Sequence, residues 1–237
     1  MPAMLNALEV TGRARTHVVQ FDAPTFAAQA EVADAFLQMR SAAAAEGVDL
    51  RPVSSFRDFR MQLRIWNQKF LGKKPLYDIT GQTRDYGALT PFEIVQSILN
   101  WSALPGGSRH QWGTEIDVVD AAATPADYAP KLLPEEVAPG GVFHPLHRWL
   151  DGNIARFGFF RPYNYDRGGM YPEPWHLSYA PASTQAVKAL DVALLREVLV
   201  GAEMAGKELV LAHLDALFEG HVLNFVPPDK QRPVAAP

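Results

Sequence analysis

The stretch Ser108–Asp117 reads SRHQWGTEID and joins a turn to the start of a strand. The Pro-Gly-Gly run at 105–107 before it predicts a turn, and EIDVV at 115–119 alternates acidic and aliphatic residues like a half-buried strand. Gly113 lets the chain reverse between the turn and the strand, because glycine adopts backbone conformations closed to other residues. We therefore expect the side chains of His110 and Asp117 to converge.

A second polar stretch, Glu173-Pro174-Trp175-His176, opens a predicted strand over 175–179. Residues three apart in a regular strand point to opposite faces of the sheet. Glu173 and His176 can therefore meet at one centre only if the chain bends at Pro174 and the strand entry.

Around these two stretches the sequence alternates predicted helices with a few short strands. The spacing of apolar residues and the capping signals predict helices over 25–46, 58–71, 90–100, 143–157, 183–198 and 208–218. A further strand is predicted over 48–53, with long loops over 72–89 and 121–141 and a frayed Pro-rich tail from Pro227. This order predicts an α+β fold, in which a small antiparallel sheet is flanked by helices. We expect one domain over 1–237, with a core at about 25–182 and a C-terminal helical extension at about 183–225.

Composition excludes several classes of function. The net charge of -4 gives no basic surface for nucleic acid, and no apolar run is long enough for membrane insertion. The chain has no cysteine, so a metal could be held only by His, Asp or Glu. The first residues, MPAMLNALEVTGRARTHVV, lack a signal-peptide core, which favours the bacterial cytoplasm, or the periplasm if a leader was removed.

The two polar stretches together supply two histidines, one aspartate and one further carboxylate. Each residue alone has an ordinary structural interpretation, such as a solvated histidine near a turn or an aspartate at a strand end. As a set they match the inventory of an open catalytic zinc site, in which three protein ligands leave one position for water.

These residues carry a family resemblance. The stretch Ser108–Asp117 resembles the Ser-x-His-x-x-Gly-x-x-aliphatic-Asp motif of zinc D-alanyl-D-alanine carboxypeptidases of the VanY type, and Glu173, Trp175 and His176 resemble that family's Glu-x-Trp-His motif. Upstream, Ser54-Ser55-Phe56-Arg57 followed by Gln62 is similar to the family's Ser-Gly-Tyr-Arg and downstream Gln. The order and separations agree over about 32–179.

The resemblance implies a fold shared with lysostaphin-type and hedgehog-type domains and one Zn²⁺ per chain. His110, Asp117 and His176 would be the zinc ligands, and Glu173 the general base. Arg57 would stabilise a carboxylate or the developing oxyanion, while Ser108 and Gln62 would bind the peptide end. The implied substrate is a peptidoglycan stem peptide or muropeptide, from which a D,D-carboxypeptidase removes terminal D-Ala. A dipeptidase, an L,D-carboxypeptidase, a murein endopeptidase or a non-catalytic zinc domain that binds peptides is the alternative.

The sequence departs from the family pattern at Glu115, where the family usually has a small residue. Glu115 is either an acid that supports the metal ligands, a group that alters the charge environment of the metal, or a solvent-facing strand residue. The aromatic residues near the motifs either line a peptide groove or pack in the core; they are Trp101, Trp112, Tyr163, Tyr165 and Tyr171. His144, His147, His213 and His221 have no motif support, and the helices after Ser183 are expected to be packing or dimer elements.

Overall fold

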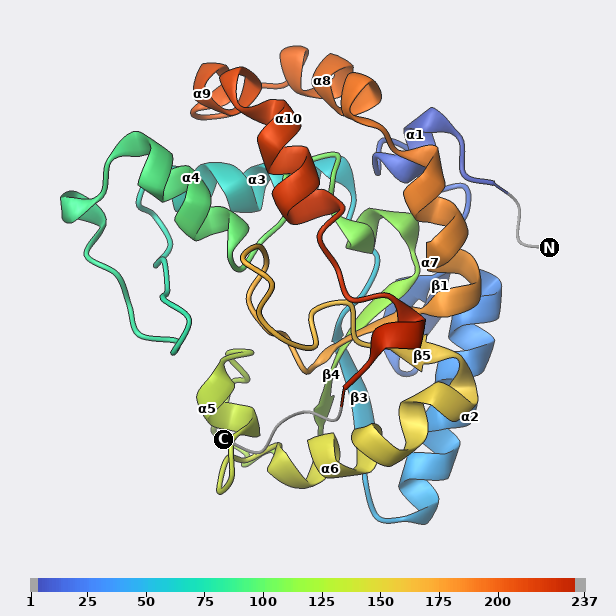
Figure 1. Cartoon of the computed structure of the whole chain (residues 1–237). Coiled ribbons are helices and arrows are strands. Elements are labelled where there is room, and N and C mark those ends of the chain that lie inside the picture. The colour runs from blue at the N-terminus through green and yellow to red at the C-terminus, as the bar shows by residue number, and fades with distance from the viewer. Residues whose placement is uncertain (1–3, 233–237) are drawn as a thin grey trace.

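A four-stranded antiparallel sheet lies at the centre of the computed structural model, which describes residues 4–232 (Figure 1). Its strand order is β3-β4-β6-β5, with bounds Leu50–Ser54 (β3), Glu115–Asp120 (β4), Phe159–Phe160 (β5) and His176–Tyr179 (β6). A separate hairpin pairs β1 (Val19–Asp22) with β2 (Thr25–Ala28). The predicted α+β fold with a small antiparallel sheet is confirmed.

Helices surround the central sheet (Figure 1). Their bounds are Ala7–Val10 (α1), Ala30–Ala45 (α2), Phe59–Phe70 (α3), Pro91–Leu99 (α4), Pro134–Val137 (α5), His144–Asn153 (α6), Ala180–Ala186 (α7), Val192–Val200 (α8), Lys207–Ala212 (α9) and Leu214–Leu217 (α10). One apolar cluster packs α2 and α6 on the sheet face that carries Ile116 and Val118. A second cluster, around Trp66, joins α3 and α4 to the C-terminal helices, which lie beside them in Figure 1.

Two helices near the site begin at the residues that the sequence indicates. Asp58 caps α3 by accepting a hydrogen bond from the Met61 N–H at 2.7 Å. Thr90 and Glu93 form a capping box at the start of α4, with Pro91 at its first position. Such caps satisfy backbone N–H groups that have no partner inside the helix. The predicted helices over 58–71 and 90–100 are confirmed.

The predicted helix over 25–46 was wrong at its start. Thr25–Ala28 forms β2, which pairs with β1, and the helix begins only at Ala30. The helix propensity of the alanines is a weak preference, and pairing with a neighbouring strand overrides it.

The predicted helix that starts at Ser183 was also wrong. Ser183 lies inside α7, where its hydroxyl oxygen is 2.9 Å from the Ser178 hydroxyl oxygen. Asp191 caps the next helix, α8, by accepting from the Leu194 N–H. The predicted last helix is likewise split, because α9 ends at Ala212 and α10 begins at Leu214.

Strand β4 keeps the predicted alternation but is buried on both faces. Ile116 and Val118 face the cluster under α2 and α6, so Glu115 and Asp117 point to the opposite face. Glu115 has no exposed surface, which overturns its interpretation as a solvent-facing residue. Buried carboxylates need partners, so this face must supply positive charge or hydrogen-bond donors.

The end of the described chain is also packed. Residues 228–230 form a single helical turn, and the Gln231 side-chain amide donates to the Arg161 carbonyl oxygen at 3.1 Å. The predicted fraying therefore does not begin at Pro227, and 233–237 lie outside the described residues. Within 4–232 no helix has both the length and the apolar character needed to cross a bilayer. The single domain and its division at about 182 stay predictions.

Candidate active site

Strands β4 and β6 place two of the predicted ligands opposite each other. Asp117 and His176 are direct partners in the antiparallel register, with the His176 Nδ1 atom 3.0 Å from Asp117 Oδ1. His110 comes from the helical turn Arg109–Trp112, and its Nε2 atom lies 3.3 Å from Asp117 Oδ2. One ligand atom from each residue lies within 4.8 Å of the others, and all three side chains are buried. The expected convergence is confirmed.

Gly113 makes the reversal between His110 and Asp117 possible. Its φ is +69°, in the left-handed region, and a Cβ atom there would lie 2.4 Å from Val18 Cγ1. A side chain at this position would therefore be strained and would also clash with the neighbouring segment.

The bend required at Glu173 is present. The His176 N–H donates to the Glu173 carbonyl oxygen at 3.0 Å, which closes a turn just before β6. Arg161 holds this turn from behind, because its Nε donates to the Pro174 carbonyl oxygen at 2.7 Å. The turn brings Glu173 Oε2 to 3.5 Å from His176 Nδ1. Glu173 thus faces the same centre as the three candidate ligands.

The second nitrogen of each imidazole has its own partner. His110 Nδ1 lies 2.8 Å from the Ser55 carbonyl oxygen, and His176 Nε2 lies 2.8 Å from Glu115 Oε2. These contacts leave His110 Nε2 and His176 Nδ1 directed at the centre. Asp117 Oδ1 is buried there without a hydrogen bond of acceptable geometry from the described residues. Two imidazole nitrogens and a carboxylate oxygen fit a divalent metal ion of the zinc type.

The ionisation of two of the three candidate ligands suits metal binding. Burial lowers the pKa of His110, although Asp117 works against this shift, and the lower pKa favours the neutral ring that a metal requires. Burial alone would raise the pKa of Asp117, but His110 and His176 outweigh it and hold this pKa low. Burial would lower the pKa of His176, but its hydrogen bonds to Asp117 and Glu115 outweigh burial and raise this pKa to about 10, so a bound metal must displace a proton from this ring. Burial raises the pKa of Glu173 to about 7, although His176 works against the rise. Glu173 can therefore exchange a proton near neutral pH.

Arg57 lies in the loop after β3 and is held by two side chains. Its guanidinium donates to Gln62 Oε1 and to Ser54 Oγ, each at 2.9 Å. Burial lowers the pKa of Arg57, while Asp117 and Glu173 favour its charged form. Gln62 itself is fully buried and donates to the Ala103 carbonyl oxygen at 2.7 Å. The structure thus places Gln62 behind Arg57 and not against the cavity, which differs from its expected contact with the peptide end.

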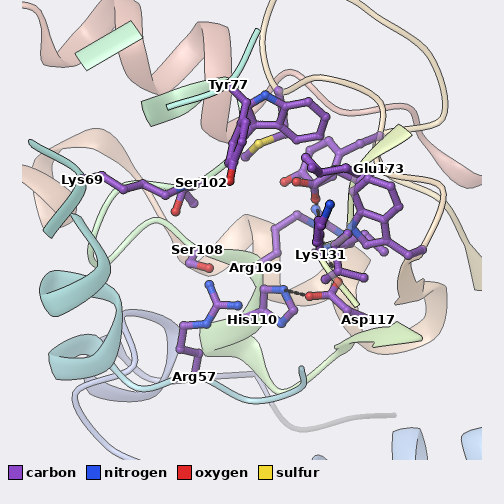
Figure 2. Close-up of a pocket in the computed structure, with 18 residues that line it drawn as sticks. Arg57, Lys69, Tyr77, Ser102, Ser108, Arg109, His110, Asp117, Lys131 and Glu173 are labelled. Atoms are coloured by element: carbon purple, nitrogen blue, oxygen red, sulfur yellow. Dashed lines mark ion pairs between the residues drawn. The ribbon is translucent and has the colours of Figure 1, made fainter. Parts of the chain in front are cut away.

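A cavity of about 200 Å³ opens onto these groups (Figure 2). Ser108, Arg57 and His110 lie on its wall. Both predicted loops border the cavity: the loop over 72–89 contributes Tyr77, and the loop over 121–141 contributes Lys131, Leu132 and Leu133. Of the aromatic residues near the motifs, Trp101 and Tyr163 line the cavity, whereas Trp112 is fully buried in the core. Tyr165 and Tyr171 do not line it.

Sequence reasoning missed the role of Lys69 as part of the cavity wall. Lys69 lies seven residues after Gln62 on α3, two turns further along nearly the same helix face. That spacing was a usable signal, because Gln62 already belonged to a motif. Arg109 was quoted within its motif but given no role, and it also lines the cavity.

Comparison with known proteins shows the family of the chain. A family model described as "VanY: D-alanyl-D-alanine carboxypeptidase" matches residues 26–182, nearly the same as the predicted core. An uncharacterized protein of Haemophilus influenzae is 30% identical over 122 residues, which is 51% of this chain and 93% of the relative. A D-alanyl-D-alanine carboxypeptidase of Enterococcus faecalis is 30% identical over 141 residues, which is 58% of this chain but only 42% of the relative.

Solved structures share the fold. VanYB in complex with D-alanine-D-alanine superposes with a TM-score of 0.54 at 21% identity, covering 84% of this chain and 98% of that one. A mutant of the vancomycin resistance D,D-pentapeptidase VanY in complex with Zn(II) gives a TM-score of 0.52 at 24% identity, covering 72% and 83%. Since the family model spans more than half of the chain, the protein belongs to the VanY family of D-alanyl-D-alanine carboxypeptidases.

Proposed function

We propose that this protein is a zinc-dependent D,D-carboxypeptidase that removes the terminal D-Ala from peptidoglycan stem peptides. One observation carries the proposal. The Glu173 carboxylate lies 3.5 Å from His176 Nδ1, beside the three converging ligand atoms, at the wall of a cavity that also holds Arg57. A zinc site with a purely structural role would need neither Glu173 nor Arg57.

His110, Asp117 and His176 are the proposed ligands of one zinc ion per chain. Zinc in an open site with three protein ligands supplies Lewis acidity, which polarises a peptide carbonyl and makes water acidic near neutral pH. The imidazoles donate hydrogen bonds to the Ser55 carbonyl oxygen and to the Glu115 carboxylate, and these bonds hold the two rings in the ligating orientation.

Glu173 is the proposed general base. With a pKa raised to about 7 by burial, its carboxylate can accept a proton from the attacking water and then pass it to the leaving amine. Groups that transfer protons in this way contribute roughly 10²- to 10⁴-fold to the rate.

Positive side chains of the cavity suit the anionic end of a peptide. Arg57, fixed by Gln62 and Ser54, lines the cavity and is the proposed group that stabilises the charge developing on the reacting carbonyl oxygen. Lys69 forms no ion pair with a described residue and lines the same cavity, so it is available for the terminal carboxylate. Ser108 offers a hydroxyl on the wall beside Arg57, and Gln62 acts by positioning Arg57.

The family supports a peptidoglycan-derived substrate. The relative from Enterococcus faecalis carries the name D-alanyl-D-alanine carboxypeptidase, and the solved VanYB structure holds D-alanine-D-alanine. We therefore favour removal of one D-Ala over cleavage of a dipeptide, an L,D bond or a cross-link, and these alternatives become outcomes of the test.

The test is mass spectrometry of purified muropeptides ending in D-Ala-D-Ala, incubated with the protein with and without a chelator. We expect loss of one D-Ala, which stops with the chelator and returns with zinc. Loss of two residues, or cleavage within a cross-link, would change the substrate class and keep the mechanism. If the zinc-loaded protein cleaves none of the pentapeptides, tetrapeptides and cross-linked dimers, that result would overturn the proposal of an enzyme and favour a zinc domain that binds peptides.

A further inference from the structure

Glu115 occupies a fully buried position directly behind the candidate metal ligands. Its Oε2 atom lies 2.8 Å from His176 Nε2. Its Oε1 atom accepts hydrogen bonds from the Ser178 and Thr114 hydroxyls, each at 2.8 Å, and lies 3.3 Å from an Arg109 guanidinium nitrogen. Every contact of this carboxylate thus comes from a donor, and one of them is a ligand imidazole.

Arg109 packs against two aromatic rings. Its guanidinium carbon lies 4.6 Å from the ring centroid of Trp112 and 4.7 Å from that of Phe225. Its side chain is only 2% exposed. Phe225 belongs to the C-terminal segment beyond the residues matched by the family model, and the next residue, Val226, is anchored by donating its N–H to the Pro162 carbonyl oxygen.

We propose that Glu115 is a positioning residue for His176, and that Arg109 and Phe225 hold it in place. The chain of contacts runs from the C-terminal segment through Phe225, Arg109 and Glu115 to His176. The inference rests on the metal site of the proposed function and extends it to residues outside the ligand set.

The chemistry of imidazole gives this contact its effect. When Nε2 donates a proton to a carboxylate, the other nitrogen keeps its lone pair, and the ring is fixed in the tautomer that a metal requires. A carboxylate partner also makes the ligating nitrogen more basic. His110 has only the neutral Ser55 carbonyl oxygen behind it, so the two imidazoles are supported unequally.

Arg109 and its aromatic cover are needed because a buried carboxylate without a compensating charge is strongly destabilising. The two rings pack against the guanidinium, and the ion pair that it forms with Glu115 is buried from water. The C-terminal segment thereby becomes part of the support of the metal site.

The first test is the zinc affinity of Glu115→Gln, measured by competition with a chromophoric chelator. We expect zinc to bind roughly 10- to 100-fold more weakly, as found when such outer partners of ligand histidines are removed. The visible spectrum of the cobalt-substituted variant should change as well, because His176 loses its fixed orientation. Glu136→Gln is the matched control: Glu136 is also buried, but it accepts from the Lys131 and Leu133 N–H groups and does not contact the ligands.

Phe225→Ala tests the outer end of the chain of contacts. It should weaken zinc binding in the same direction as Glu115→Gln, whereas Phe225→Tyr, which keeps the ring over Arg109, should match the wild type. Equal zinc affinity and cobalt spectra in wild type and Glu115→Gln would overturn the proposal. Unchanged affinity in Phe225→Ala alone would overturn the role of the C-terminal segment.

If Glu115→Gln does not fold, the proposal can still be tested on the wild-type protein through the tautomer of His176. In zinc-loaded protein labelled with ¹⁵N-histidine, long-range proton–nitrogen spectra should show His176 with a proton on Nε2 and zinc on Nδ1. Zinc on Nε2 would contradict the proposal. If the wild type binds no zinc at all, the proposed function fails as well, so the two failures are distinguishable.

Discussion

Asp117 and His176 face each other across two hydrogen-bonded strands, and the side-chain atoms Oδ1 and Nδ1 are 3.0 Å apart. Their separation is set by the spacing of antiparallel strands and not by a loop. A site built on paired strands keeps its geometry more precisely than one built on loops. Only His110 and Glu173 have to be brought in by turns, and each of those turns is closed by its own hydrogen bond.

Replacing His110 by alanine should abolish stoichiometric zinc. The variant removes one of three ligands, and the remaining imidazole and carboxylate cannot complete the site. Elemental analysis of the dialysed variant measures its zinc content and checks this prediction. The control is His213→Ala, which should keep one zinc. It removes an exposed histidine between α9 and α10. Stoichiometric zinc in His110→Ala would refute the ligand assignment.

Replacing Glu173 by alanine should lower kcat by roughly 10²- to 10⁴-fold, because the general base is lost. Zinc should stay bound, since Glu173 is not a proposed ligand. Muropeptide turnover and metal content are measured on the same sample. The exposed Glu219→Ala serves as a control with normal activity. Turnover at the wild-type rate in Glu173→Ala would rule out this role.

Replacing Gln62 by methionine should impair catalysis, although Gln62 itself does not contact the substrate. Gln62 Oε1 holds the Arg57 guanidinium at 2.9 Å, and a hydrogen bond to a charged group is worth about 1.5–3 kcal/mol. We expect kcat/KM to fall about tenfold or more while zinc affinity is unchanged. If Arg57→Lys and Gln62→Met together lose no more than Arg57→Lys alone, the two residues act through one contact. Fully additive losses would mean that Gln62 acts separately from Arg57.

Because of Lys69, substrate binding should weaken as the pH rises into the alkaline range. Burial lowers the pKa of Lys69 to about 8, although Glu173 works against this shift. The ammonium is charged below this pKa and neutral above it, so KM for a peptide with a free carboxylate should rise between about pH 7 and pH 9. In Lys69→Met, KM should already be high and should not rise further. Lys73→Met, at an exposed position that does not line the cavity, should behave like the wild type.

His147 should make the fold sensitive to acid. Burial and the charge of Arg161 lower the pKa of His147 from 6.5 to about 3. Between these values the unfolded chain binds one more proton than the folded chain, so stability falls as the pH drops from about 6.5 to 3. The slope is up to about 1.4 kcal/mol per pH unit.

His147→Leu should remove this part of the acid sensitivity. Urea unfolding between pH 7 and pH 4, with a chelator present so that metal release does not contribute, checks the slope. His213→Leu is the control, with an exposed histidine. Identical slopes in wild type and His147→Leu would contradict the assignment.

Much of the fold could be predicted because local signals decide it. The caps at Asp58 and Thr90 satisfy helix ends with groups only three residues away, so the sequence already contains them. The hairpin of β1 and β2 could not be predicted in this way. Thr25–Ala28 has no strong local preference, and its conformation follows from pairing with Val19–Asp22.

The sequence by itself determined the inventory of the site: the turn at Gly113, the alternation in β4, and the set of two histidines and two acids at family spacing. Tertiary structure alone decided that Glu173 turns toward His176, that Gln62 lies behind Arg57, and that Glu115 is buried against His176 with Arg109. The physical reason is that spacing fixes which face of a strand or helix a residue occupies. What covers that face depends on segments far away in the chain, such as the one that carries Phe225.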